Sequence, residues 1–533
     1  MRFIIVLSGP VGVGKSSFAK KLDELFDVKK VSTSSWMQQH YGVAAERAAL
    51  QAYGDKLDIE TNGEWVTDAV VEWAASADED AVLLVDSARI SPQIEHLRSK
   101  FAEKVIHIHL HAGDDLLEKR YLDRLPEHKE FETYSEVRTN GTEAAVGSLA
   151  KIADLVLDTD HADARTLAVT AMAFIGDSPA QIDKLVDVIV GGQYGSEGKG
   201  NICAHLASQY SVLMRIGGPN AGHLVKDPFY KYVQLPSGTG TNKDAAILIG
   251  AGSTLWLPQL MLEIMDHGLT AARLSIDPQA MVIDDEDRRI ESGSLTSIAS
   301  TKQGVGVATA RKILNRGDVS VFGSPVKLAR DVPQLSKFVR DVRAELDLHL
   351  AAGRRILLEG TQGTLLSVHH GFWPSVTSRE TSAAGCLSDA GIAPARVRKV
   401  IMVVRTYPIR VGGTSGWMGR EIDMEDVASR SGISKEEFLR VEKGTISGTK
   451  RRMAEFDWAQ LRRSALLNGA TDVALTFADY LGKENRVATN FAELNDATRQ
   501  FIERVERVTG ARVTLVSKEF AKDGVLEEGF TND

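Results

Sequence analysis

The sequence contains very little cysteine. Only Cys203 and Cys386 occur among 533 residues. Two cysteines are too few for a disulfide framework or a cysteine-rich metal site. Their scarcity is typical of proteins that work in a reducing compartment, and we expect a cytoplasmic protein.

Excess positive charge and long apolar runs are also missing. The chain has 63 Lys and Arg against 72 Asp and Glu, a formal net charge of -9. Nonspecific binding to nucleic acid or to an acidic membrane needs a basic face, so we predict neither partner. No stretch approaches the roughly 20 apolar residues of a membrane span. Residues 3–7 are apolar but lead into a glycine-rich turn rather than a cleavage site, so we expect a soluble chain.

What the sequence does contain is an alternation of strand and helix patterns. Residues 3–22 and 186–208 each have the pattern of a buried strand, a glycine-rich turn and a helix. Residues 81–85 and 105–110 have the pattern of further strands. Such alternation predicts an α/β fold, with two P-loop-like domains whose mainly parallel sheets are flanked by helices.

The length of the chain suggests two or more domains. Turn-forming residues at 176–179 indicate the boundary. We therefore predict a first domain at residues 1–177 and a second at 186–533. The Leu- and Val-rich stretch at 335–350 predicts an amphipathic helix.

The first glycine-rich turn, residues 9–16, fits the phosphate-binding pattern G-x-x-x-x-G-K-[ST] without a mismatch. In such a loop the backbone N–H groups surround phosphates, the lysine reaches the outer phosphates and the hydroxyl holds Mg²⁺. A strand precedes this loop and a helix follows it, which is the required context. The predicted nucleotide-binding residues are Gly9, Gly12, Gly14, Lys15, Ser16 and Ser17, with Ser16 as the Mg²⁺ ligand.

Three later residues of this domain extend the predicted site. Asp86 ends an apolar strand, where a carboxylate can meet the Mg²⁺ shell, although a plain strand-end acid is a real alternative. Arg120 and Arg124 lie four residues apart on one helical face and can clamp phosphates, but two solvated arginines are about as common. With residues 47–54 and 86–92, the domain resembles P-loop deoxynucleoside monophosphate kinases. That resemblance places Arg47 and Arg89 near the acceptor nucleotide.

The second glycine-rich turn, residues 191–200, also carries a lysine before a helix but does not match the Walker pattern. It describes a phosphate site at a helix N-terminus. Residues 217–223 follow, with His223 beside Gly222 and near Asn220. A lone histidine is more often structural than catalytic, but this setting favours acid or base work.

Six motifs in the second domain follow one another in the order typical of adenylosuccinate synthetase, and the domain resembles that family from residue 186 to the C-terminus. Members phosphorylate the 6-oxygen of a purine nucleotide with GTP and then displace the phosphate with aspartate. The resemblance implies a homodimer with shared sites. The motifs are residues 191–200, 217–223, 235–238, 359–366, 374–378 and 410–412.

The resemblance also assigns roles to individual residues. His223 would stabilise charge at the 6-oxygen, and the Gly222 carbonyl would bind Mg²⁺. The triphosphate would be held around Lys199 by Gly195, Glu197, Gly198, Gly200, Asp479 and Ser517. Asn220, Thr301, Gln362 and Thr377 would hold the purine nucleotide, and Ser447, Thr449 and Arg451 the aspartate.

The sequence departs from the family at its general base. Ser196 stands where the family has its catalytic aspartate. We predict Ser196 at the catalytic and metal-binding position, although a hydroxyl is neutral and a weaker Mg²⁺ ligand than a carboxylate. A small neutral residue beside C2 of the purine makes room for a 2-amino group, which favours dGMP or GMP as acceptor.

Three further departures concern the other substrates. Phe477 replaces the lysine of the family's guanine-reading T-K-x-D segment; a phenyl ring can stack on any base, so ATP or dATP becomes a plausible donor beside GTP. Thr449 replaces an arginine that reaches the ribose 2′-hydroxyl, and Asn315 takes the place of an arginine contributed by the neighbouring subunit, with Arg316 beside it. These losses resemble the bacteriophage synthetases of 2-aminoadenine biosynthesis.

Three hypotheses remain open on the sequence. The first is a bifunctional enzyme, a ligase acting on a 2-aminopurine nucleotide fused to a deoxynucleotide kinase. The second is an IMP-using adenylosuccinate synthetase with an appended kinase. The third is a nucleotide sensor with an impaired ligase domain. Ser196 disfavours the second, whereas the retained Lys199 and His223 disfavour the third.

Overall fold

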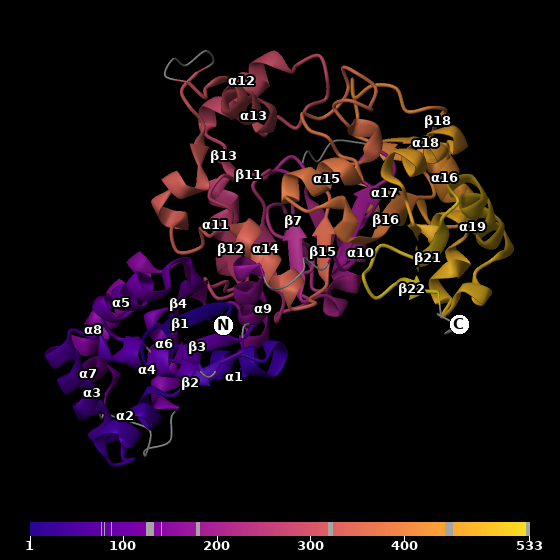
Figure 1. The fold of residues 1–533 in the computed structure, drawn as a ribbon. Helices are drawn as coiled ribbons and strands as arrows, with labels where there is room; N and C mark the ends of the chain where they lie inside the picture. Colours follow the sequence, from indigo (N-terminus) through magenta and orange to yellow (C-terminus); the bar gives the residue numbers. More distant parts are fainter. Residues whose placement is uncertain are drawn as a thin grey trace. The chain divides into compact units, whose positions relative to one another are not determined.

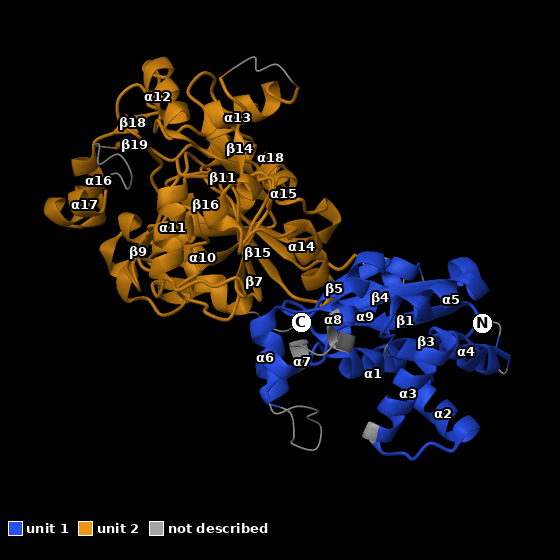
Figure 2. Ribbon diagram, turned by 90° about the vertical axis from the view of Figure 1, so that its left-hand side faces the viewer, with its two compact units in different colours: residues 1–181 blue, residues 182–533 orange. Residues whose placement is uncertain are grey.

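The computed structural model describes residues 1–75, 77–78, 80–86, 88–123, 133–139, 141–176, 182–317, 323–442 and 451–528. Arg124, Ser447 and Thr449 lie outside these ranges, as does the side chain of Arg47. The chain forms two compact units, residues 1–181 and 182–533 (Figure 2).

Unit 1 is built on a five-stranded parallel sheet in the order β2-β3-β1-β4-β5. Figure 1 labels strands β1 to β4 of this sheet. Its strands are β1 (Phe3–Ser8), β2 (Lys29–Val31), β3 (Val82–Asp86), β4 (Val105–His111) and β5 (Leu155–Asp158). Its helices are α1 (Lys15–Phe26), α2 (Thr33–Tyr41), α3 (Arg47–Thr61), α4 (Trp65–Ala75), α5 (Ser91–Phe101), α6 (Asp114–Leu122), α7 (Tyr134–Thr139), α8 (Gly141–Ser148) and α9 (Ala164–Ile175).

Both faces of this sheet are buried. Successive side chains of a strand point to opposite faces, so Ile5 and Leu7 of β1 pack with α1, α6 and α9. Ile4 and Val6 pack with α2, α3, α4 and α5 on the other face. Each such fully buried side chain contributes about 1.5–3 kcal/mol. A strand covered on both sides explains the continuous apolar run at residues 3–7.

Unit 2 is built on a nine-stranded sheet in the order β12-β10-β7-β15-β6-β16-β20-β21-β22, in which only β22 runs antiparallel to its neighbour. The strands of this sheet are β6 (Val186–Gly191), β7 (Val212–Arg215), β10 (Ala246–Ile249), β12 (Leu274–Ile276), β15 (Ile356–Glu359), β16 (Val397–Arg405), β20 (Asp472–Thr476), β21 (Arg512–Ser517) and β22 (Val525–Glu527). Shorter strands are β8 (His223–Val225), β9 (Tyr230–Tyr232), β11 (Thr254–Leu255), β13 (Met281–Val282), β14 (Lys327–Leu328), β17 (Ile409–Arg410), β18 (Glu421–Ile422) and β19 (Arg452–Ala454).

Helices cover both faces of this large sheet. Helices α14, α15, α18 and α19 pack on the face that carries Val188. Helices α10 and α11 pack on the opposite face, with Ile189. The helices of unit 2 are α10 (Lys199–Leu206), α11 (Leu257–Asp266), α12 (Asp285–Ser294), α13 (Val305–Leu314), α14 (Val342–Ala351), α15 (Ala383–Ala390), α16 (Met424–Ser431), α17 (Lys435–Val441), α18 (Trp458–Asn468) and α19 (Asp496–Thr509).

The predicted α/β class with mainly parallel, helix-flanked sheets is confirmed, but the helix expected at residues 335–350 is too long. Helix α14 begins only at Val342, because the Asp341 side chain accepts a hydrogen bond from Ala344 N (3.0 Å) and caps it there. Leu335 instead ends a short 3₁₀ turn. Within the described ranges, no helix combines the length and the apolar character needed to span a bilayer.

Candidate functional sites

Two strand–turn–helix segments repeat one geometry, once in each unit. In unit 1, α1 begins at Lys15 directly after Gly14 (φ 99°), and in unit 2, α10 begins at Lys199 directly after Gly198 (φ 89°). Neither glycine supplies a side-chain cap. The first-turn N–H groups of both helices are therefore not used by a capping side chain, and such N–H groups form an anion site.

The first loop is held close to the neighbouring strand. Gly9 has φ 141°, and a Cβ at this position would stand 2.5 Å from the Leu110 carbonyl oxygen, so only glycine fits. The Lys15 ammonium donates to the carbonyls of Gly9 and Pro10, the latter at 3.1 Å. Ser16 and Ser17 are exposed in the first turn of α1. The loop thus presents a lysine, two hydroxyls and backbone N–H groups to solvent.

Two of the further predicted residues lie around this loop. The Arg120 guanidinium, on α6, donates to Thr159 Oγ1 (2.8 Å), to the Thr159 carbonyl (2.9 Å) and to the Val13 carbonyl in the loop (3.4 Å). Asp86, at the end of β3, forms an ion pair with Lys30 at 2.6 Å. Arg120 therefore contacts the phosphate loop, while Asp86 already has a cation.

A cavity of about 280 Å³ lies beside the end of β3. Arg89 is among its lining residues and stands 3.8 Å from the Asp55 carboxylate. Asp58 accepts hydrogen bonds from the Trp65 indole (2.7 Å) and from Gln93 Nε2 (2.8 Å). Among its described lining residues, the cavity offers one guanidinium and several acidic and amide groups to a ligand.

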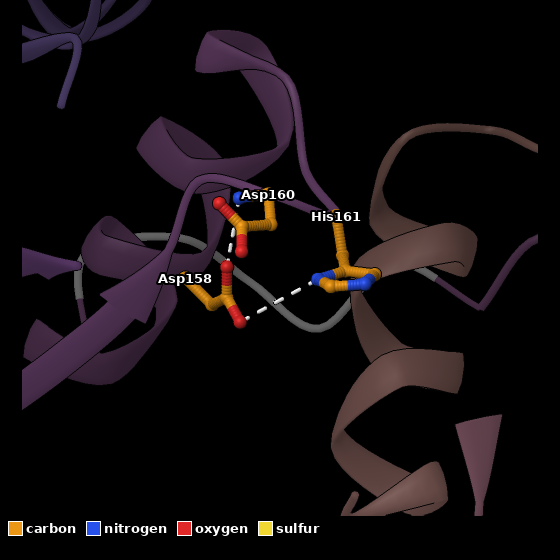
Figure 3. Close-up of side chains that lie close together, drawn as sticks. All are labelled: Asp158, Asp160 and His161. Carbon is orange, nitrogen blue, oxygen red and sulfur yellow. Dashed lines mark hydrogen bonds and ion pairs between the residues drawn. The ribbon is translucent and has the colours of Figure 1, made fainter. Parts of the chain in front are cut away.

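Unit 1 also contains a cluster of acidic side chains and a histidine: Asp158, Asp160 and His161 (Figure 3). Both Asp160 carboxylate oxygens accept from Gly113 N, which precedes α6 (2.9 and 3.0 Å). Asp158 accepts from Asp160 N (2.7 Å), and its second oxygen lies 3.5 Å from His161 Nδ1. These contacts fix the turn that carries Thr159, the partner of Arg120, so we assign the cluster to the fold.

The second turn is held from within by a buried ion pair. Glu197 and Lys199 are almost fully buried, and their side chains meet at 2.7 Å. Glu197 also accepts from Gln193 N (3.0 Å) and Gly195 N (2.7 Å). Gly195 has φ 94°, and a Cβ there would stand 2.9 Å from Gln362 Cα. Glu197 therefore shapes the turn, a role that its place in a glycine-rich motif did not predict.

A pocket of about 220 Å³ opens beside this turn. It gathers residues from seven separate stretches of the chain. Gln362 Nε2 donates to Thr377 Oγ1 (2.6 Å), and Asn220 Nδ2 donates to the same oxygen (3.3 Å). The amide oxygens of both Asn220 and Gln362 are buried without a partner, as expected for groups that await a ligand's donors. The predicted residues that line the pocket are Gly195, Ser196, Asn220, Gly222, Thr301, Gln362, Thr377 and Arg451.

Ser196 lines a pocket that contains few acidic side chains. Among the described residues that line it, Glu291 is the one acidic residue. Its two oxygens accept from Gly304 N and Gly306 N, both at 2.7 Å. The hydrogen bonds at the start of α13 therefore occupy this carboxylate, and it does not replace the acid missing at position 196.

His223 directly follows Gly222 but is not among the described residues that line the pocket, and it is bound to Glu359, 136 residues away. The His223 Nδ1 is hydrogen-bonded to the Glu359 carboxylate, and its Nε2 is buried without a partner. Burial and the nearby Arg215 hold the pKa of His223 at about 4, against the opposing effect of Glu359. Although burial raises the pKa of Glu359, Arg215, His223 and Ser237 together lower it to about 2.

The sequence did not single out Glu359 as a functional residue. It belongs to a recognised motif and ends strand β15, and a strand-end acid is the signal that could have identified it. Its other contacts are with Arg215 Nη1 (3.1 Å), Ser237 N (2.7 Å) and Ser237 Oγ (2.6 Å). A carboxylate with this many donors fixes the orientation of the imidazole.

The segment at the end of β20 that leads to the predicted triphosphate residue Asp479 packs against the second turn. Thr476 Oγ1 donates to the Glu197 carbonyl at 2.6 Å. The ring of Phe477 is only 5% exposed, with the Arg405 guanidinium 3.9 Å from its centre and Phe520 stacked at 5.9 Å. The phenyl ring expected to stack on a base is therefore covered by protein side chains.

The remaining predicted residues have internal contacts. The Ser517 hydroxyl donates to the Glu519 carbonyl (2.7 Å). Arg451 stands 3.4 Å from Glu442, which Arg405 also contacts at 2.6 Å. Asn315 donates to the carbonyls of Gly323 (3.2 Å) and Ser324 (3.3 Å). Arg316 donates to the Ile313 carbonyl (2.8 Å).

Known proteins resemble about two thirds of the chain. The adenylosuccinate synthetase of Methanocaldococcus jannaschii is 36% identical over 341 residues, 62% of this chain and 93% of that protein. The succinoaminodeoxyadenylate synthetase (PurZ) of cyanophage S-2L, solved with dGMP and with dATP as an energy donor, is 29% identical, with a TM-score of 0.53 over 65% of this chain and 96% of that chain. The fully ligated adenylosuccinate synthetase of Plasmodium falciparum is 20% identical and shares the fold, with a TM-score of 0.55 over 65% of this chain and 100% of that chain.

The sequence profile of adenylosuccinate synthetase matches residues 188–321 and 326–489, more than half of the chain. Both matched segments lie in unit 2. The chain therefore belongs to the adenylosuccinate synthetase family, with a ligase of that type in residues 182–533.

Proposed function

We propose that unit 2 joins L-aspartate to C6 of a 2-amino-6-oxopurine nucleotide, dGMP or GMP. The product is an N6-succino-2-amino-(deoxy)adenylate, and ATP, dATP or GTP supplies the phosphoryl group. The observation that carries the proposal is Ser196 on the wall of the 220 Å³ pocket, at the position where the family has an aspartate.

The chemistry of a hydroxyl supports a 2-amino substrate. A serine is smaller than an aspartate and uncharged, and its oxygen can accept a hydrogen bond from an amine. The cyanophage enzyme solved with dGMP and dATP supports the same substrate class. Thr449, outside the described residues, removes a family arginine that reaches the ribose 2′-hydroxyl, which favours a deoxynucleotide.

The side chains around His223 suit the displacement of a phosphorylated 6-oxygen. In this reaction the aspartate amine forms a bond to C6, and the 6-oxygen leaves with the phosphoryl group as phosphate. In the imidazolium form, the unpartnered Nε2 of His223 is the group that donates to the leaving oxygen. Glu359 stabilises the imidazolium form by its charge. Arg451 lines the pocket, which supports its assignment to a substrate carboxylate.

The oxygen atoms at and near the two glycine-rich turns are suitable ligands for Mg²⁺. The Ser196 hydroxyl and the Gly222 carbonyl line the same pocket, and both are oxygen donors of the kind that Mg²⁺ prefers. Ser16 offers a hydroxyl in the first turn of α1. When bound, Mg²⁺ neutralises charge on the phosphates. We propose these residues as its protein ligands.

We further propose that unit 1 is a (deoxy)nucleoside monophosphate kinase. Its phosphate loop, Arg120 beside that loop and the 280 Å³ cavity at Asp86 and Arg89 support this assignment. A nucleoside monophosphate must be phosphorylated to the triphosphate before it can be polymerised. A kinase that acts in the same pathway is therefore consistent with a ligase in the same chain. By analogy with its family, the ligase would work as a cytoplasmic homodimer.

A panel of acceptors tests the ligase. The full chain would be incubated with aspartate, Mg²⁺ and ATP, dATP or GTP, and with IMP, dIMP, GMP or dGMP, and products would be identified by mass. We expect succinylated product from dGMP or GMP. Turnover of IMP alone would instead identify an IMP-using synthetase. The 36% identity to the adenylosuccinate synthetase of Methanocaldococcus jannaschii favours this second candidate function. Binding without product from any acceptor would identify a nucleotide sensor.

A second test separates the two units. Lys15→Ala should abolish phosphoryl transfer to monophosphates and leave succinylation intact, because Lys15 and Lys199 belong to different units. Loss of succinylation in this variant would contradict two independent sites.

A further inference from the structure

Asp479 lies beside the turn that the proposed function assigns to the triphosphate. It follows β20, whose last residue, Thr476, donates to the Glu197 carbonyl within that turn. A Cβ at Gly198 would stand 3.5 Å from the Phe477 ring. When the phosphates of a nucleoside triphosphate are held at Lys199, we therefore expect its purine or pyrimidine ring to reach the Asp479 carboxylate.

The two oxygens of this carboxylate are not equivalent. Asp479 Oδ2 accepts from Arg486 Nε (3.0 Å) and from Arg486 Nη2 (2.9 Å). Asp479 Oδ1 is buried and has no partner. Both lone-pair sites of Oδ2 are therefore used, and a ligand meets a single accepting oxygen.

Arg486 is itself fixed in this position. Its third nitrogen, Nη1, donates to Glu437 on α17 at 2.7 Å. With one side of the guanidinium on Asp479 and the other on Glu437, rotation of the side chain would break three hydrogen bonds. The asymmetry of the Asp479 carboxylate is thus part of the packed structure.

A single acceptor suits adenine better than guanine. Guanine presents two adjacent donors, the N1–H and the 2-amino group, and requires two accepting oxygens on one carboxylate. Adenine presents one donor, its 6-amino group. A donor left without a partner in a buried site costs roughly tenfold in affinity or more.

We propose that Arg486 is a specificity-determining residue for the phosphoryl donor. By occupying Asp479 Oδ2 it leaves one acceptor and selects ATP or dATP over GTP. Phe477 does not compensate with a polar contact, since its ring is buried against Arg405 and Phe520. The proposal rests on the proposed function only in placing the donor at Lys199.

Binding of triphosphates tests this without any acceptor. The full chain carrying Lys15→Ala, which removes the loop lysine of unit 1, would be titrated calorimetrically in Mg²⁺ with non-hydrolysable analogues of ATP, GTP and ITP. We expect the ATP analogue to bind at least tenfold tighter than the GTP analogue. ITP lacks the 2-amino group, so it should bind at least as tightly as GTP. A GTP analogue that binds as tightly as the ATP analogue, or tenfold tighter than the ITP analogue, would overturn the proposal.

A substitution gives an independent readout. In the same background, Arg486→Met frees the second oxygen of Asp479 and should narrow the ATP-to-GTP affinity ratio by about tenfold, chiefly through tighter GTP binding. Arg504→Met, an exposed arginine stacked on Trp458 in the same unit, is the matched control and should leave the ratio unchanged. An unchanged ratio in a folded Arg486→Met protein would also overturn the proposal.

If Arg486→Met does not fold, the comparison of ITP with GTP in the background protein decides the question alone. These measurements contain neither aspartate nor a monophosphate. A negative result in these binding measurements therefore does not contradict the proposed succinylation of dGMP. Equally, an enzyme that fails to succinylate dGMP does not contradict the proposed preference for ATP over GTP.

Discussion

His223 and Glu359 form a buried hydrogen-bonded pair in which the carboxylate holds Nδ1 and leaves Nε2 directed to no protein partner. The histidine lies at the start of β8, and the glutamate lies at the end of β15. The two strands belong to different sheets, so the pair exists only because tertiary packing brings β8 to the end of β15.

Glu359→Gln should lower the turnover number of the ligase by about 10- to 100-fold with little change in KM, because a charge-assisted hydrogen bond to the imidazole is lost. Glu359 raises the pKa of His223, so the variant loses the imidazolium at a lower pH. The alkaline limb of the pH–rate profile should therefore move to lower pH. Steady-state kinetics across pH would measure both effects. Ser237→Ala, which removes only one donor to Glu359, should have a smaller effect. An unchanged profile in Glu359→Gln would argue that the carboxylate has no role in positioning His223.

Ser196→Asp should shift acceptor preference toward IMP. A carboxylate restores the family's proton acceptor and occupies the space proposed for the 2-amino group. We expect the ratio of kcat/KM for IMP to that for dGMP to rise by about tenfold or more. Ser196→Ala is the control, since it removes the hydroxyl without adding charge and should not raise IMP use. If Ser196→Asp loses dGMP turnover and gains none with IMP, the residue does not determine the purine.

Lys199→Met should destabilise unit 2 far more than Lys15→Met destabilises unit 1. Removing Lys199 leaves the almost fully buried Glu197 carboxylate without its cation, at a cost of about 3–5 kcal/mol. Lys15 contacts carbonyl groups of its own loop, which solvent can replace. Urea unfolding would measure the difference. The double variant Lys199→Met/Glu197→Gln should recover much of the stability but not the ligase activity, and its failure to recover would contradict this account.

Unit 1 should lose stability as pH falls below about 6.5. Ser8 Oγ lies between His107 Nε2 (2.7 Å) and His109 Nδ1 (2.8 Å) on the neighbouring strand. Burial holds the pKa of each histidine at about 4. Between pH 6.5 and 4 the unfolded chain binds protons that the folded chain does not, so the free energy of unfolding decreases as pH falls.

Each histidine contributes at most ~1.4 kcal/mol per pH unit over this range. The urea midpoint of unit 1, measured from pH 7 to 5, would show the slope. His107→Gln should reduce it, whereas His96→Gln, on α5 and only half-buried, should not. An equal slope in wild type and His107→Gln would show that another group causes the acid sensitivity.

Much of this protein could be predicted from local patterns. The strand–glycine–lysine–helix pattern predicted the glycine-rich turns before α1 and α10, because a turn of this kind is made by adjacent residues. The order of motifs identified the ligase family. The Leu- and Val-rich stretch at 335–350 shows the limit of periodicity, since the cap at Asp341 decides where α14 begins.

The sequence by itself determined the class of the fold, the two glycine-rich turns before α1 and α10 and the replacement of the family's acid by Ser196, since each depends on a residue and its immediate neighbours. Only the tertiary structure decided that Glu359 holds His223 and that Arg486 occupies one oxygen of Asp479. It also decided that Phe477 is covered rather than available to a base. The reason is physical. A buried charge or ring takes whatever partner the packed sheet places within a few ångströms, and for Glu359 that partner is 136 residues away in the sequence.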